Sequence, residues 1–116
     1  MKNCTDLPQI KKLAEILPLE SADMSWASTG LGKPFARTIP LKGHPEEICG
    51  CWSLVALLDV LPNKLRIALA INDFQGDRKE KYSIGSVEHD KYDCFADNPV
   101  DACVEMILKL HELNLL

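Results

Sequence analysis

The period-two alternation of residues 64–73 is the feature that most constrains the fold of this chain. In "KLRIALAIND" a large apolar residue stands at every second position, namely Leu65, Ile67, Leu69 and Ile71. Successive side chains of a β-strand point to opposite faces, so this pattern is typical of a strand with one buried face. "KYSIGSV" (81–87) follows the turn-rich "FQGDRKE" and reads as the returning strand. The sequence therefore predicts a β-hairpin with a loop longer than two residues.

The last twenty residues carry the strongest helix signals. "DNPVDACVEMILKLHELNLL" offers Asn98 as the N-cap, Pro99 at the first helical position and Asp101 in the first turn, near the positive end of the helix dipole. The apolar residues at helical spacing are Cys103, Met106, Ile107, Leu110 and Leu113. The closing "LNLL" predicts that the segment after this helix is packed, with Leu115 and Leu116 buried.

Two more helices are predicted upstream. In "TDLPQIKKLAEILP" Thr5 or Asp6 can cap the start, and Pro18 is expected to stop the helix. In "CWSLVALLDVLP" Ser53 can cap the start, and Pro62 ends the helix. The apolar stripes predicted to be buried are Ile10, Leu13, Ala14 and Leu17 in the first helix and Leu54, Leu57, Leu58 and Leu61 in the second.

Short segments elsewhere read as additional strands. "MSWAS" and "YDCFA" are short possible strands, and "FARTIPL" is a further one that Pro40 restricts to a sheet edge. We therefore predict a single α+β domain over residues 1–116. A small antiparallel sheet, centred on 64–73 and 81–87, is expected to be covered on one face by the C-terminal helix and the 53–61 helix, with the first helix at its edge.

Composition excludes several functional classes. The net charge of -4 comes from 17 acidic and 13 basic residues spread along the chain. Binding a nucleic-acid backbone requires clustered Lys and Arg, so no nucleic-acid partner is predicted. No apolar run is long enough to cross a bilayer, so no membrane partner is predicted and the cytoplasm is the expected location. Five cysteines without a secretory context are expected to be reduced thiols.

Two segments share a His-x4-Cys spacing, His44 with Cys49 and His89 with Cys94, and Cys51 lies close by in "GHPEEICGCW". Imidazole and thiolate are zinc ligands, but the pattern lacks the paired Cys-x2-Cys elements typical of structural zinc sites. The other interpretation is that Cys51 and Cys94 are small buried apolar residues and that the histidines lie in loops. We predict no metal or cofactor, with zinc binding through these four residues as the alternative.

A cysteine nucleophile is a further hypothesis. Cys49 or Cys51 precedes the 53–61 helix, whose positive dipole end favours a thiolate, and His44 or His89 would have to act as the base. Nothing in the sequence shows that these residues converge. "TGLGK" (29–33) lacks the spacing of a phosphate-binding loop and reads as a hairpin turn.

The aromatic residues and the last histidine have simpler interpretations. Trp26, Trp52 and Phe35 either line a ligand groove or belong to the core, and the core is favoured for Trp52 because it precedes an apolar helix stripe that it can cover. His111 sits one position outside the stripe of the C-terminal helix, which is typical of a solvated flank.

Three stretches, "KKLAEILPLESADM", "CWSLVALLDVLP" and "DNPVDACVEMILKLHELNLL", carry a resemblance to known proteins. The chain resembles a group of small, functionally uncharacterised proteins encoded in prophages and other mobile elements of gut bacteria. Their pattern is a Trp-Ser-Leu helix ending in Leu-Pro, a variable β-hairpin and a C-terminal Asp-Ala-x-x-Glu-Met helix. The resemblance implies a genetic neighbourhood and no reaction.

Because no catalytic constellation is visible, the predicted function is non-enzymatic. We expect a binding or accessory module of a mobile element that contacts another protein, a host factor or an element-encoded one, through a sheet edge or the middle of the chain. Self-association is compatible with this prediction.

Overall fold

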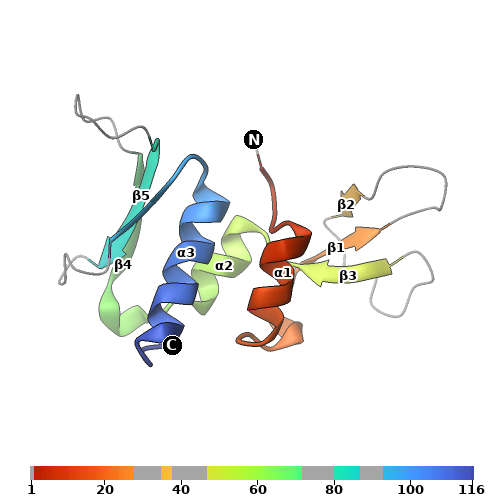
Figure 1. Cartoon of the computed structure of the whole chain (residues 1–116), viewed down its shortest axis with the longest axis horizontal. Coiled ribbons are helices and arrows are strands. Elements are labelled where there is room, and N and C mark those ends of the chain that lie inside the picture. The colour runs from red at the N-terminus through yellow and green to blue at the C-terminus, as the bar shows by residue number, and fades with distance from the viewer. Residues whose placement is uncertain (1, 28–34, 38–46, 72–79, 87–92) are drawn as a thin grey trace.

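The computed structural model describes residues 2–27, 35–37, 47–71, 80–86 and 93–116. Figure 1 shows three helices, α1 (Leu7–Ala14), α2 (Leu54–Val60) and α3 (Pro99–Glu112), between two small antiparallel sheets at opposite ends of the long axis. This is an α+β fold, as predicted. Two predicted features, "TGLGK" and Pro40, lie outside the described residues.

The N-terminal sheet has the strand order β2-β1-β3. Its strands are β1 (Met24–Ala27), β2 (Phe35–Arg37) and β3 (Glu47–Cys51), and β1 pairs with both neighbours in antiparallel fashion. The described parts of the predicted strands "MSWAS" and "FARTIPL" form β1 and β2. Within the described residues β2 is an edge strand, as expected. The strand β3, which covers the second half of "GHPEEICGCW", was not predicted, and it pairs with β1 on the side opposite β2.

The C-terminal sheet is a meander with the strand order β4-β5-β6. It consists of β4 (Ile67–Ile71), β5 (Tyr82–Ser86) and β6 (Cys94–Ala96), paired in register from Ile67 opposite Ser86 to Ile71 opposite Tyr82. The predicted hairpin is therefore confirmed. The first strand starts at Ile67 instead of residue 64, because the segment Asn63–Leu65 forms a 3-10 turn and Arg66 adopts a left-handed backbone with φ of 50°.

Local capping explains where the helices begin. Asp6 accepts from the Gln9 backbone N–H at 2.9 Å, and the Gln9 side chain accepts from the Asp6 N–H at 3.0 Å, a complete capping box for α1. Ser53 caps α2 and Asn98 caps α3, with Pro99 at the first helical position. These three N-terminal assignments agree with the sequence prediction.

The end of α3 is a Schellman motif. Asn114 has a left-handed backbone with φ of 59°, its N–H donates to the His111 carbonyl, and the N–H of Leu115 donates to the Leu110 carbonyl at 2.8 Å. Leu115 consequently turns back and packs against the core. The prediction of a packed end holds for Leu115, whereas Leu116 is exposed.

One continuous core joins the two ends of the molecule, and α3 lies at its centre. This helix contacts α1, α2 and all three strands of the C-terminal sheet. The largest side chains that are fully buried in the core include Trp52, Leu13, Leu57, Ile84, Met106, Ile107 and Leu110. In contrast to the prediction, α2 packs mainly on α3, and the described residues form two sheets where one was expected.

Three predicted core positions face solvent. Ala14, Leu58 and Leu113 are exposed, and Ala56 is buried in their place on α2. The rotation of α2 is fixed by its cap at Ser53 and by Leu57, which is fully buried, so the apolar spacing alone does not select the inner face. Within the described residues, no helix is long and apolar enough to cross a bilayer.

Candidate functional site

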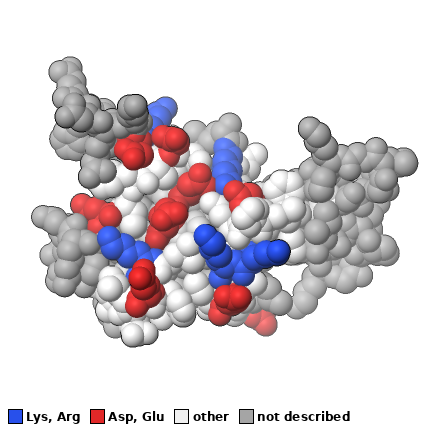
Figure 2. All heavy atoms as spheres, viewed as in Figure 1, with Lys and Arg blue, Asp and Glu red and all other residues white. Residues whose placement is uncertain are grey.

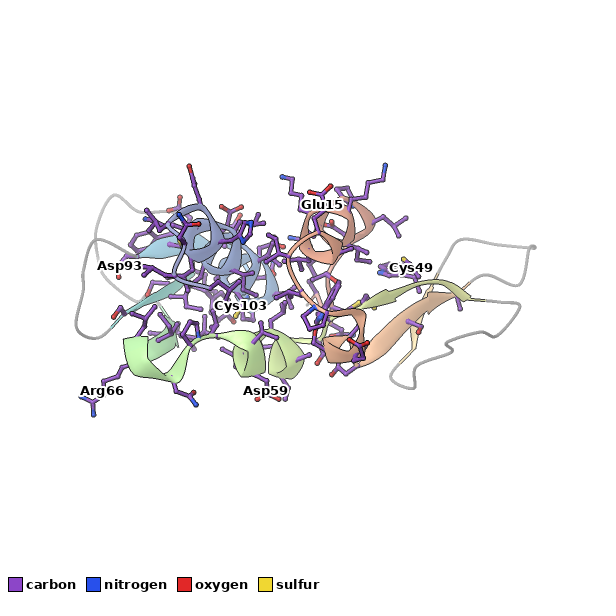
Figure 3. The ribbon with its side chains drawn as sticks, turned by 90° about the horizontal axis from the view of Figure 1, so that it is seen from below. Glu15, Cys49, Asp59, Arg66, Asp93 and Cys103 are labelled. Carbon is purple, nitrogen blue, oxygen red and sulfur yellow. The ribbon has the colours of Figure 1, made fainter. Side chains whose placement is uncertain are left out.

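The structure separates the two cysteines of the alternative zinc-binding hypothesis. Cys49 lies in β3 and Cys94 in β6. Figure 3 shows Cys49 and Asp93, the chain neighbour of Cys94, at opposite ends of the molecule. His44 and His89 lie outside the described residues. Zinc–sulfur bonds are about 2.3 Å long, so one ion cannot bind both cysteines in this arrangement. The part of the chain that is described contains no group of three or more His, Cys, Asp or Glu side chains that could hold a metal ion.

Burial makes Cys51 and Cys103 poor nucleophiles in the closed fold. Cys51 is fully buried and lies three residues before α2. Burial, together with the neighbouring Cys4, raises the pKa of the Cys51 thiol far above its ordinary value. Burial alone raises the pKa of Cys103 to about 12. These shifts are opposite to those that activate a catalytic cysteine, so the structure does not support Cys51 as a catalytic nucleophile. For the half-buried Cys49 the hypothesis stays a prediction.

The tryptophans are structural. Trp52 is fully buried, as predicted, and its indole N–H donates to Ser21 Oγ at 2.8 Å. Trp26 is half-buried, packs against the core and donates from its indole N–H to the Thr5 carbonyl at 2.9 Å. Each indole nitrogen thus joins segments that are distant in the sequence, which gives both residues a structural role. The exposed His111 agrees with the predicted solvated flank.

Two open grooves carry carboxylates. One, of about 490 Å³, runs between β6 and α3 and contains Asp93, Glu105 and Glu112 beside Lys109. The other, of about 400 Å³, lies beside α2 and contains Glu20, Asp23 and Asp59. Figure 2 shows acidic side chains gathered over α3 and the neighbouring sheet, with basic ones among them. The first groove is also lined by Cys94. Burial raises the pKa of this thiol, a shift opposite to the one that activates a nucleophile.

The outer edge of β4 is the surface that stands out. Its strand order leaves one side of β4 without a partner strand among the described residues. The five residues from Ile67 to Ile71 contain no charge and no proline. Ala68, Ala70 and Ile71 are exposed, and the Ile71 side chain is 64% accessible. Natural edge strands usually carry Lys, Pro or a bulge that prevents further pairing, and β4 has none of these devices.

Sequence reasoning predicted a sheet edge as a contact surface but did not identify the strand. The charge-free run "IALAI" was a usable signal, because an edge strand that lacks charge is open to pairing. What the sequence could not supply was the strand order that places β4 outside. A strand with one buried face shows the same alternation of apolar residues whether it lies at the edge or in the centre of a sheet. The alternation in β4 therefore could not reveal its edge position.

No protein-family model, curated protein or solved structure matches this chain. The resemblance to proteins of prophages and mobile elements therefore stays a prediction.

Proposed function

We propose that this protein is a non-enzymatic protein-binding module whose β4 edge pairs with an extended segment of another protein. The observation that carries this proposal is the edge position of β4 together with its charge-free, proline-free run from Ile67 to Ile71. Strand addition to a sheet edge takes its affinity from backbone hydrogen bonds and its specificity from alternate side chains.

The side chains along β4 define the chemistry of the partner. Ala68 and Ala70 are small and exposed, so they leave room for larger side chains on the added strand. Ile71 offers an accessible apolar surface at the end of the strand. A segment that fits is extended, uncharged over about five residues and apolar at alternate positions. On the resemblance described above, this segment belongs to a host factor or to a protein of the same mobile element.

The test is a selection of binders from a displayed library of random peptides, followed by amide hydrogen exchange of the protein with the selected peptides. The edge variant is Ala70→Lys, which places a long charged side chain on the edge. The matched control is Ala14→Lys, which adds the same charge at an exposed position on α1. Circular dichroism establishes that both variants keep the wild-type fold.

We expect the selected peptides to alternate apolar residues, to protect the β4 amides, and to bind the Ala70→Lys variant at least about tenfold more weakly while binding the control equally. Peptides that protect another surface, or that bind both variants equally, would refute the proposal. Concentration-dependent dimerisation that Ala70→Lys abolishes would also refute it, because the edge would then serve a second copy of this chain.

A further inference from the structure

Cys4 and Cys51 form a buried pair of thiols. Cys4 precedes α1, Cys51 is the last residue of β3, and neither forms a disulfide. The two side chains share a thiol hydrogen bond. Only 5% of Cys4 and none of Cys51 is accessible. The two thiols therefore lie side by side, although Cys4 and Cys51 are 47 positions apart in the sequence.

The backbone around the pair holds the two segments together. Cys4 forms an isolated antiparallel bridge with Ser53. The Thr5 N–H donates to the Trp52 carbonyl at 3.0 Å, and the Trp52 N–H donates to Thr5 Oγ1 at 3.1 Å. Cys51 is thus the diagonal neighbour of Cys4 across this bridge. The Cα atoms of a disulfide lie closer together than those of a diagonal pair in a regular sheet. The two segments must therefore move towards each other, and one isolated bridge hinders this movement less than a full ladder of backbone hydrogen bonds would.

We propose that Cys4 and Cys51 are a disulfide-forming site that reacts with a small disulfide such as oxidised glutathione. In the first step, the deprotonated sulfur of Cys4 attacks glutathione disulfide, and one glutathione leaves as its thiolate. In the second step, the deprotonated sulfur of Cys51 attacks the sulfur of Cys4 and displaces the second glutathione. Two protein thiols and one glutathione disulfide thereby give one protein disulfide and two molecules of reduced glutathione.

The order of these steps follows from access and charge. Cys4 is the more accessible thiol of the pair. Burial raises its pKa, but the hydrogen bond from Cys51 and the nearby charge of Lys2 act in the opposite direction. Cys51 has no accessible surface, and burial followed by the influence of Cys4 raises its pKa. Cys4 is therefore the entering thiol, and the reaction needs the segment before α1 to open.

The experiment incubates the folded protein with oxidised glutathione and maps the product by mass spectrometry without reduction. We expect a mass loss of roughly 2 Da, from the two thiol hydrogens, and a peptide in which Cys4 is joined to Cys51. We expect the unfolding temperature to rise by roughly 5 °C, because the bond closes a long loop, and to return to its original value with a reducing agent.

The variants separate this pair from the other thiols. Cys4→Ser and Cys51→Ser should each abolish the bond, and Cys103→Ser, which changes a buried thiol in α3, should leave it intact. Because serine is close in size to cysteine, we expect each variant to keep the wild-type fold. Circular dichroism verifies this. A bond between Cys49 and Cys51, a bond that includes Cys103, or no bond in folded wild-type protein would each overturn the proposal.

Discussion

Lys2 Nζ lies 2.7 Å from Asp101 Oδ1, so an ion pair connects the segment before α1 to the first turn of α3. The same ammonium group contacts Asp6 Oδ2 at 2.7 Å and donates to the Gln9 side chain at 2.9 Å. Asp101 also accepts from Gln9 Nε2 at 2.7 Å and from Asn98 Nδ2 at 2.7 Å. One network therefore links the N-terminal caps of both helices.

This network predicts a pH-dependent contribution to stability. Burial by itself raises the pKa of Asp101, but hydrogen bonds from Lys2, Gln9 and Asn98 lower it below the ordinary 3.8. Its contribution is thus present above pH 3.8 and is lost as the pH falls through the lowered value. Burial by itself lowers the pKa of Lys2, but its bonds to Asp101 and Asp6 raise it above 10.5. That contribution is present below pH 10.5 and is lost as the pH rises through the raised value.

We expect Lys2→Met to reduce the free energy of unfolding at pH 7 by about 0.5–1 kcal/mol, the range for partly exposed ion pairs. The difference from wild type should shrink in strong acid, where Asp101 is protonated. Urea unfolding between strong acid and pH 7 measures the difference in the free energy of unfolding between variant and wild type. The control is Lys11→Met, because Lys11 is exposed on α1. An equal loss in strong acid and at pH 7 would show that the ion pair contributes nothing.

A second prediction concerns the start of α2. Ser53 caps this helix, and both its N–H and its hydroxyl donate to the carboxylate of Asp23. Ser53→Ala should destabilise the protein by about 1 kcal/mol, the usual cost of removing a cap. The double variant with Asp23→Asn should lose less than the sum of the two single losses, because both changes remove the same interaction. Asp59→Asn, on the exposed side of α2, is the control and should combine additively with Ser53→Ala.

A third prediction compares the two tryptophans. Trp52 is fully buried, so Trp52→Ala should cost about 3–5 kcal/mol of stability through lost burial and the cavity left behind. Trp26 is only half-buried, and Trp26→Ala should cost clearly less. Chemical denaturation monitored by circular dichroism gives both values without depending on tryptophan fluorescence. Equal costs would show that Trp52 is not the centre of the core at this end of the molecule.

A fourth prediction concerns the close approach of β5 to the residue before β6. A Cβ atom at Gly85 would lie 1.9 Å from Asp93 Oδ1 and 3.4 Å from Asp93 Cα. Since the Asp93 side chain is exposed, it can move aside, and Gly85→Ala should cost less than about 1 kcal/mol. In an Asp93→Ala background the same change should cost nothing or be stabilising. A loss of several kcal/mol that persists in that background would mean that the backbone, and not the carboxylate, prevents a side chain here.

Local signals in the sequence were sufficient to predict the elements that are determined by residues close to one another in the chain. The start of α3 was predicted in full, because Asn98 and Pro99 act within one helical turn. The β4–β5 hairpin was predicted because alternation and a turn suffice to define it. By contrast, β3 was missed. Its sequence "EICGC" contains Gly50 and acquires its strand conformation by pairing with β1.

The candidate sites depended still more on tertiary structure. The spacing that relates His44 to Cys49 and His89 to Cys94 was visible in the sequence, yet the fold places the two cysteines in different sheets. Conversely, the contact between Cys4 and Cys51 has no local signal. It arises because the segment before α1 pairs beside β3, which only the assembled fold can show.

The central position of α3 has a consequence for biosynthesis. A ribosome produces both sheets before it produces Pro99–Glu112, the helix that lies between them and contacts elements from each half of the chain. Until that helix leaves the exit tunnel, the faces of α2 and β5 that contact it in the finished protein stay uncovered. The core is therefore completed only after the strands of both sheets have been synthesised, and the apolar surfaces that α3 covers are exposed during that interval.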